Sequence, residues 1–288
     1  MTKADAPEGA ADTTWKHTPT RVIKAGGVEF AYRELGPRGG VPLVFLHHLT
    51  AVLDDWDPRV IDGSAARRHV ITFDNRGVGA SSGSVPHTID EMAADAVAFI
   101  RGLGHDQVDL LGFSLGGGVA QVIALEHPDL VRRAILAGTG PAGGGGIEKV
   151  TKIAVTAYVK AALTLRDPRH FLFFQRTPQG KRAATDYMAR LKERTEDRDK
   201  RFSPMAMRAQ LKAIRAAGVQ APHDLGRIRQ PVLVANGDND VMVASEHSAD
   251  MARRLPNAKL VIYPDSGHGG VFQYHQQFVP EVLEFLER

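Results

Sequence analysis

A serine in a tight, glycine-flanked turn is the residue of this chain best placed to do chemistry. Ser114 stands in the run GFSLGG over residues 112–117, after the apolar run 107–111 and before a long amphipathic stretch. A strand is therefore expected to give way to a helix at the serine. A Cβ on either flanking glycine would collide with the incoming strand or the outgoing helix. We expect the hydroxyl to be exposed at the strand tip, beside the first free N–H groups of a helix; an ordinary strand-to-helix turn is the alternative interpretation.

A serine hydroxyl is almost wholly protonated at neutral pH, so it becomes a nucleophile only beside a base. Histidine can serve as that base, and a carboxylate then holds its ring in the right tautomer. Two later loops, each following an apolar run, carry such groups: the first holds Asp238 and Asp240, and the second holds His268. Because parallel strands end at one edge of a sheet, both loops are expected on the side of Ser114.

The pattern of apolar runs indicates an α/β fold with a mostly parallel sheet of eight strands. The expected strands cover residues 22–24, 28–33, 42–47, 70–73, 107–111, 133–137, 231–235 and 259–263. The first two flank Gly26-Gly27 and are expected to form a hairpin. Helical spacing of apolar residues marks 88–103, 116–126, 245–255 and a last segment from about residue 274. Strands that alternate with helices predict a parallel sheet with helices on both faces.

The alternation of strands and helices stops after residue 140. Residues 141–225 begin with a proline and a glycine run and then look helical throughout. We expect them to form a helical cap over the carboxyl edge of the sheet, where ligands bind in open α/β sheets. The core is then expected over residues 21–140 and 226–288. Residues 1–20 lack an apolar stretch and are expected to form a flexible tail.

Taken together, four motifs make the chain resemble the α/β-hydrolase superfamily from about residue 20 onward. They are Gly112-x-Ser114-x-Gly116, Asp74-x-Arg76-Gly77-x-Gly79-x-Ser81, Gly237-x-x-Asp240 and Gly267-His268. The resemblance implies Ser114 as the nucleophile, His268 as the general base and Asp240 as the acid that orients the base. Family spacing favours Asp240 over the competing Asp238, which would then be a loop carboxylate.

The negative charge that develops on a substrate carbonyl oxygen requires backbone N–H donors. In the family one donor follows the nucleophile, which assigns Leu115, and the other comes from the loop after the strand 42–47. That loop departs from the family's usual His-Gly pair, because His48 stands where the glycine is expected. Alignment assigns the Leu49 N–H as the second donor, with the His48 N–H as the alternative. The His48 ring is expected either to contact substrate or to fill space.

Further pocket residues are expected among the side chains beside the motif loops and in the cap. With His48 they are Trp56, Phe113, Tyr158, Met242 and Phe272. Core packing is the alternative role for these apolar side chains. The apolar content of the cap favours a small, moderately hydrophobic substrate.

These implications predict a serine hydrolase that cleaves an ester, lactone or related acyl bond of a small, fairly apolar molecule through an acyl-enzyme. No metal or organic cofactor is required, and no histidine pair has the spacing of a metal site. Carbon–carbon bond hydrolysis and perhydrolysis by the same triad are alternatives, as is a non-catalytic ligand-binding role. Epoxide hydrolase and dehalogenase chemistry is disfavoured, because those relatives use a carboxylate where this chain has Ser114.

Composition argues against several other classes of protein. The 288 residues carry 36 basic and 33 acidic side chains, for a formal charge of +3, which does not indicate a nucleic-acid-binding surface. The absence of cysteine excludes disulfides and thiolate nucleophiles. No apolar run approaches the ~18 residues needed to cross a bilayer, so a cytoplasmic protein without a membrane partner is expected. The sequence carries no signal for an oligomeric state.

One glycine motif invites a different interpretation. Gly138-x-Gly140-x-x-Gly143 follows a strand and fits the spacing of a dinucleotide-binding turn. Such a turn opens a βαβ unit, whereas this one leads into the helical region 141–225. A hinge or loop is therefore the favoured interpretation.

Overall fold

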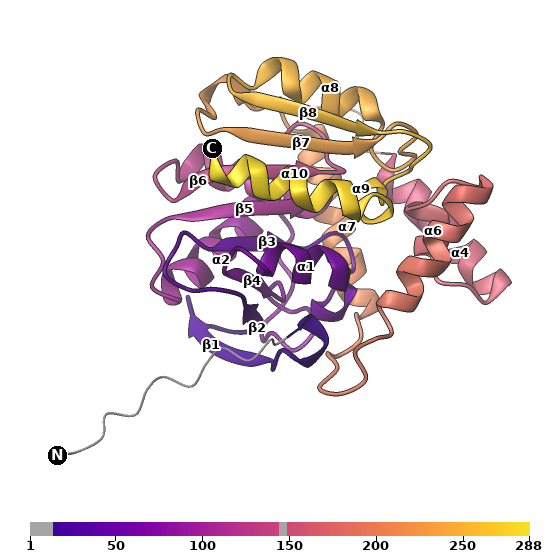
Figure 1. Ribbon diagram of the computed structural model, residues 1–288, viewed down its shortest axis with the longest axis horizontal. Helices are drawn as coiled ribbons and strands as arrows, with labels where there is room; N and C mark the ends of the chain where they lie inside the picture. Colours follow the sequence, from indigo (N-terminus) through magenta and orange to yellow (C-terminus); the bar gives the residue numbers. More distant parts are fainter. Residues whose placement is uncertain (1–13, 144–148) are drawn as a thin grey trace.

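A computed structural model describes residues 14–143 and 149–288 (Figure 1). The strands are β1 Arg21–Ala25, β2 Val28–Leu35, β3 Leu43–Leu46, β4 Val70–Phe73, β5 Val108–Phe113, β6 Val131–Ala137, β7 Val232–Gly237 and β8 Ala258–Tyr263. The helices are α1 Pro58–Ala65, α2 Ile89–Gly102, α3 Leu115–Glu126, α4 Val150–Thr164, α5 Arg169–Leu172, α6 Pro178–Arg190, α7 Pro204–Val219, α8 Ser245–Arg254, α9 Gly270–Gln273 and α10 His275–Glu287. All eight expected strands are present, and α1 is a helix that the apolar pattern did not mark.

The eight strands form one sheet in the order β1-β2-β4-β3-β5-β6-β7-β8. The hairpin β1–β2 is antiparallel, and β2 also pairs antiparallel with β4. All the ladders from β4 onward to β8 are parallel. The expectation of a mostly parallel, eight-stranded sheet flanked by helices is confirmed, with the antiparallel part confined to one edge. The loops that follow the parallel strands therefore meet at a single edge.

Burial explains why the central strands read as continuous apolar runs. Every residue of β3 and β5 is buried, as expected for strands covered on both faces. Helix α1 packs against α10, and α2 packs against α3. The outer strand β1 is mostly exposed instead, and its turn to β2 uses Gly26 and Gly27 at φ +55° and +79°. Two-residue hairpin turns need such positive φ values, so the expected hairpin is confirmed.

Among the described residues, the α-helices α4 to α7 lie between β6 and β7 in the chain; we call this segment the helical insertion. Figure 1 shows α4 and α6 beyond the ends to which the arrows of β7 and β8 point. The hydroxyls of Thr177 and Ser203 cap the N-termini of α6 and α7, and a proline follows each. Residues 144–148 of the expected cap, with most of its glycine run, lie outside the described residues. No helix within the described ranges combines the length and apolarity needed to span a membrane.

The expectation of a flexible tail over residues 1–20 is wrong for residues 14–20. Trp15 is only 1% exposed, and its backbone N–H donates to Asp62 at 2.6 Å. The guanidinium of Arg33 lies 5.2 Å from the centre of the indole ring. A single buried tryptophan carries enough apolar surface to anchor a short segment. Residues 1–13 are outside the part of the chain that the structure describes.

Candidate active site

Ser114 occupies a strained turn between β5 and α3. Its backbone has φ +55° and ψ −114°, a conformation that residues with a side chain rarely adopt. A Cβ on Gly112 would lie 2.3 Å from the carbonyl oxygen of Gly116, and one on Gly116 would lie 2.1 Å from that of Leu46. The two glycines therefore allow the strand, the turn and the helix to approach each other. The collision at Gly112 is with the outgoing helix, as the sequence predicted, whereas that at Gly116 is with the neighbouring strand β3.

His268 and Asp240 form a buried pair at the loops that follow β8 and β7. The Nδ1 of His268 lies 2.7 Å from Oδ2 of Asp240, so this nitrogen carries a proton and donates a hydrogen bond to the carboxylate. The other oxygen of Asp240 accepts the backbone N–H groups of Met242 and Val243 at 2.7 and 3.0 Å. Both side chains are almost fully buried. The pair thus fixes the imidazole tautomer and leaves Nε2 as the free ring nitrogen.

Asp238, the competing acid, lies in an exposed loop and does not contact His268. Its carboxylate accepts the backbone N–H groups of Asp265 and Ser266 at 3.0 and 3.1 Å and the side-chain amide of Asn239 at 2.8 Å. Slight burial acts to raise the pKa of Asp238, but these hydrogen bonds outweigh it and lower the pKa. The carboxylate stabilises the turn between the two loops.

A small cavity of about 20 Å³, which we call the central cavity, brings the two halves of the site together. Ser114 and His268 both line it. Within the described part of the chain no hydrogen bond joins these two side chains; catalytic hydrogen bonds are often looser before substrate binds. Among residues 14–143 and 149–288, no three His, Asp or Glu side chains are arranged to hold a metal ion.

Leu49 and Leu115, the residues expected to supply the two N–H donors, each line a cavity that Ser114 also lines. Neither N–H has an acceptor among the described residues. Leu115 is the first residue of α3, so its N–H has no partner within the helix. Thr50 adopts φ +66°, and its N–H donates to Gln210 at 2.8 Å. The loop after β3 thus leaves the Leu49 donor unpaired next to Ser114.

His48, in place of the family's glycine, is a neutral acceptor at the central cavity. It is 5% exposed, and burial lowers its pKa to about 4. Its Nδ1 lies 2.8 Å from the carbonyl oxygen of Leu49, so Nδ1 carries the proton and Nε2 bears a lone pair. No described residue pairs with that Nε2. The ring packs edge-on against Phe113 and Phe173.

The other expected pocket residues divide into two groups. Tyr158 and Met242 line the central cavity, and the Tyr158 hydroxyl donates to Thr50 at 2.9 Å. Three others are fully buried and do not line the central cavity, contrary to the expectation: Trp56, Phe113 and Phe272. Phe113 supports the imidazole of His268 at a centroid distance of 5.0 Å and stacks edge-on against Phe272. Their place beside motif loops in the sequence did not reveal on which side of the strand ends they would lie.

Two residues that the sequence did not assign to the site, Arg169 and Phe173, also line the central cavity. The Phe173 ring lies 5.6 Å from that of His268. Arg169 forms ion pairs with Asp55 of the core and with Asp167. Burial acts to lower the pKa of Arg169, but the charge of Asp55 and the hydrogen bond with Asp167 raise it well above its usual value. No motif marks either residue, because both reach the cavity through docking of the insertion.

The dinucleotide-like glycine motif has a structural use here. Gly138 follows β6 with φ +54°, and a Cβ there would lie 2.7 Å from the ring of Phe113 and 3.3 Å from that of His268. The glycine therefore leaves room for the imidazole to approach the end of the sheet. This close approach explains why a glycine stands at position 138, so no nucleotide-binding role is needed to explain it.

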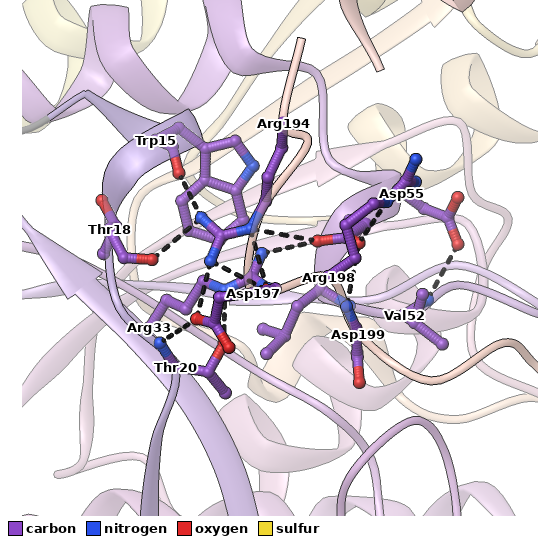
Figure 2. A network of polar contacts seen from close by, with 12 residues as sticks. Trp15, Thr18, Thr20, Arg33, Val52, Asp55, Arg194, Asp197, Arg198 and Asp199 are labelled. Atoms are coloured by element: carbon purple, nitrogen blue, oxygen red, sulfur yellow. Dashed lines mark hydrogen bonds and ion pairs between the residues drawn. The ribbon is translucent and has the colours of Figure 1, made fainter. Parts of the chain in front are cut away.

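Arginines tie the loop between α6 and α7 to the core (Figure 2). Arg194 donates to the carbonyl oxygen of Thr18 at 2.9 Å. Arg33 of β2 is fully buried and donates to Asp54 at 2.8 Å and to the carbonyl oxygen of Asp197 at 3.0 Å. Because these donors are buried and bonded to main-chain groups, they fix the loop against the sheet edge.

Asp74 opens the second family motif but does not line the central cavity. One of its oxygens accepts the N–H of Leu53 at 3.0 Å, and the other accepts that of Ala80 at 3.1 Å. The carboxyl of Asp199, from the loop between α6 and α7, accepts the same Leu53 N–H at 3.2 Å. Burial, and then the contact with Asp199, raise the pKa of Asp74 well above its usual value. The two carboxyls thus meet where the insertion touches the core.

Comparison with known proteins identifies the family. A sequence model described as alpha/beta hydrolase fold matches residues 41–273. The solved structure of an alpha/beta hydrolase fold protein from Chitinophaga pinensis is 37% identical to this chain and superposes with a TM-score of 0.91. That similarity covers 95% of this chain and 99% of the other.

Two relatives carry the names of hydrolases. A protein of Caulobacter sp. (strain K31) named "Putative carbamate hydrolase RutD" is 30% identical over 92% of this chain and 98% of its own length. The pimeloyl-[acyl-carrier protein] methyl ester esterase of Nitrosomonas europaea is 27% identical over 83% of this chain and 93% of its own length. With the fold, these matches show that the chain belongs to the α/β hydrolase family.

Proposed function

We propose that the protein is a serine hydrolase that cleaves an ester, lactone or related acyl bond of a small, fairly apolar substrate. The observation that carries the proposal is the buried pair of His268 and Asp240, which opens onto the same cavity as Ser114. An imidazole whose Nδ1 is held by a carboxylate can accept a proton only at Nε2. The relatives named as a carbamate hydrolase and a methyl ester esterase support acyl chemistry.

In the proposed mechanism Nε2 of His268 takes the proton of Ser114 as Oγ attacks the substrate carbonyl carbon. The carbonyl oxygen becomes an oxyanion, which the N–H groups of Leu49 and Leu115 stabilise because neither has another acceptor among the described residues. His268 then gives its proton to the leaving group, and the acyl-enzyme forms. A water molecule, deprotonated by the same nitrogen, attacks the acyl carbon. The bond from that carbon to Oγ of Ser114 then breaks, Oγ takes the proton back from His268, and the acid is released. Asp240 keeps its negative charge throughout and stabilises the imidazolium.

We propose further that residues 141–225 form a cap over a core of residues 21–140 and 226–288. Side chains of the insertion face Ser114 and His268 across the central cavity, among them Tyr158, Arg169 and Phe173. A second cavity of about 50 Å³ adjoins Ser114; we call it the apolar cavity. Its lining combines core and insertion side chains, chiefly Ile89, Val122, Val150, Ile214 and Val243. A lining of this kind supports a substrate with an apolar group next to the scissile bond.

Covalent labelling tests the proposal directly. A fluorophosphonate probe should form an adduct on Ser114, located by peptide mass spectrometry, and Ser114→Ala should lose the adduct. Turnover of nitrophenyl esters, from acetate to octanoate, should fall by about four orders of magnitude or more in Ser114→Ala. Ser84→Ala removes an exposed serine and serves as the matched control. A wild-type protein with neither adduct nor turnover would refute the proposal and favour a ligand-binding role.

A further inference from the structure

A much larger cavity continues from the central one toward the surface. It measures about 590 Å³, and we call it the charged cavity. The two cavities share five lining residues, namely His48, Thr50, Tyr158, Pro168 and Arg169. Pockets of several hundred cubic ångströms are the size that small-molecule ligands occupy. Ser114 therefore lies between an apolar cavity on one side and a large polar one on the other.

The carboxylates that line the charged cavity are all occupied by partners. Asp55 and Asp167 are both paired with Arg169. Asp54 accepts from Arg33 at 2.8 Å and from Arg198 at 3.1 Å. Asp199 accepts the backbone N–H groups of Leu53 and Lys200 and adjoins the carboxyl of Asp74, whose pKa is raised by burial and by this contact.

Three cations of the same lining have no such partner. Lys192, Lys200 and Arg201 are exposed, and none of them forms an ion pair with any residue that the structure describes. They come from the end of α6 and from the loop before α7, the loop that buried arginines fix to the core. The charged cavity therefore presents unpaired positive charge on a loop that is fixed to the core, and none of the three cations lines the central cavity with Ser114.

We propose that the charged cavity binds an anionic group, a carboxylate or a phosphate, at the end of the substrate remote from the scissile bond. The inference rests on the proposed function and extends it to a substrate class: an acyl compound with an apolar group on one side and an anionic group on the other. Lysine and arginine recognise both anions by charge-assisted hydrogen bonds. Screening by salt should weaken the preference, because the three cations are exposed.

Three esters with the same scissile bond and the same spacer test this inference. One ends in a carboxylate, one in a phosphate monoester and one in a neutral carboxamide. Wild-type kcat/KM for the preferred anionic ester should exceed that for the carboxamide by about tenfold, mostly through KM, and the ratio should fall in about 0.5 M salt. The two anionic arms distinguish a carboxylate substrate from a phosphate one.

Matched variants assign the preference to the cavity. The triple variant Lys192→Gln, Lys200→Gln, Arg201→Gln should lose most of the tenfold preference while it turns over the carboxamide as before. The control variant Lys181→Gln, Arg182→Gln, Arg215→Gln removes three exposed cations that do not line the cavity and should keep the preference. Equal rates for all three esters in the wild type, or equal losses in both triple variants, would overturn the anionic site.

Binding measurements keep this inference separate from the proposed function. The Ser114→Ala protein should bind the anionic ester about tenfold more tightly than the carboxamide by calorimetry, and the Lys192, Lys200, Arg201 variant in that background should not. Equal affinity refutes the anionic site even if Ser114 proves to be the nucleophile. Charge-dependent binding by a protein that hydrolyses none of the esters upholds the site and refutes the hydrolase.

Discussion

The two walls of the central cavity are held in place by different kinds of contact. On the core side main-chain contacts dominate: the Ser114 N–H donates to Ala137 at 2.9 Å, and Asp240 accepts two backbone N–H groups. On the insertion side the contacts join side chains, as between Tyr158 and Thr50 or between Arg169 and Asp55. The first wall carries the groups proposed for bond cleavage, and the second carries those that face the rest of the substrate.

The surroundings of the two walls differ in the same way. The core wall is backed by buried aromatic rings such as Phe113 and Phe272. The insertion leaves large apolar side chains in solvent, with Val159, Leu163 and Leu165 being 56%, 81% and 95% exposed. Changes in the core wall should therefore alter the chemical step or the stability of the fold. Changes in the insertion wall should chiefly alter which substrate is accepted.

The largest effect is expected from the acid of the core wall. Asp240→Asn should lower kcat by about 10⁴-fold, because the amide would favour the wrong imidazole tautomer. Asp238→Asn should change kcat by less than about threefold, since its exposed carboxylate accepts backbone N–H groups of the neighbouring loop and does not bond to His268. Steady-state kinetics on a short nitrophenyl ester compares the two. The reverse ranking would transfer the orienting role to Asp238.

Next in size is the buried arginine that joins the two regions. Arg33→Met removes the fully buried partner of Asp54 at 2.8 Å. Among the described residues Asp54 then keeps only Arg198 and Arg194 as ion-pair partners, at 3.1 and 3.7 Å, so we expect unfolding to require about 3 kcal/mol less. The matched control is Arg59→Met, which breaks an exposed pair with Glu193 at 2.6 Å and should cost less than about 1 kcal/mol. Urea unfolding measures both. Equal losses would mean that burial does not distinguish these two bridges.

Gly116→Ala should destabilise the turn that holds Ser114. The new Cβ would lie 2.1 Å from the carbonyl oxygen of Leu46, and backbone atoms cannot yield as a flexible side chain can. We expect a loss of about 3 kcal/mol or more in unfolding free energy. Gly118→Ala, in the same helix, places its Cβ 3.2 Å from the tip of Ile89 and should cost less than about 1 kcal/mol. A variant at 116 as stable as the one at 118 would contradict the packing argument.

The core wall and the insertion wall also differ in how much of each could be predicted from the sequence. The turn at Ser114 was predictable. Close approach of the backbone at positions 112 and 116 requires glycine at both, and these two glycines are visible in the sequence. The strand before Asp240 was predictable because every residue of β7 is buried, and strands buried on both faces are continuous apolar runs. The strand before His268, β8, lies at the edge of the sheet with only Tyr263 buried, and it was predictable from its own short apolar run. The expected hairpin at Gly26 and the mostly parallel sheet follow from patterns of this kind too.

The misjudged residues are those whose role depends on docking between distant segments. Trp15 anchors the residues assigned to a tail, because Asp62 and Arg33 lie where its backbone and ring can meet them. Arg169 and Phe173 enter the central cavity from a segment with no motif. Sequence spacing describes neighbours along the chain, whereas these contacts join segments that are far apart in the chain, as with Arg169 and Asp55, or elements whose facing sides are set by packing.

Acidification should lower the free energy of unfolding through two buried histidines of the core. Burial lowers the pKa of His47 to about 3 and that of His48 to about 4, below the ordinary value of about 6.5. The unfolded chain therefore takes up these protons first, so stability is complete above about pH 6.5 and falls as the pH drops toward 4. Each histidine should contribute about 2 kcal/mol of loss by about pH 5.

Urea unfolding between about pH 8 and pH 5 measures this slope. His48→Gln should remove the contribution of one histidine and flatten the curve by about half of the expected loss. His87→Gln replaces an exposed histidine and should leave the slope as it is. The same His48→Gln protein also tests the ring at the central cavity: unchanged rates and an unchanged ester preference would reduce it to a space-filling role.

The smallest effect, and the one of opposite sign, is expected where the insertion touches the core. The pKa of Asp74 is raised by burial and by Asp199, so the native protein holds this proton to higher pH than the unfolded chain does. Stability should therefore fall as the pH rises from about 4 through the raised pKa. In Asp199→Asn an amide replaces the second carboxyl and can donate to an ionised Asp74, which should gain about 1 kcal/mol at pH 8 relative to pH 5. The difference in unfolding free energy between variant and wild type, followed across that range, isolates this contribution from that of the histidines. A difference that does not change with pH would show that the two carboxyls do not share a proton.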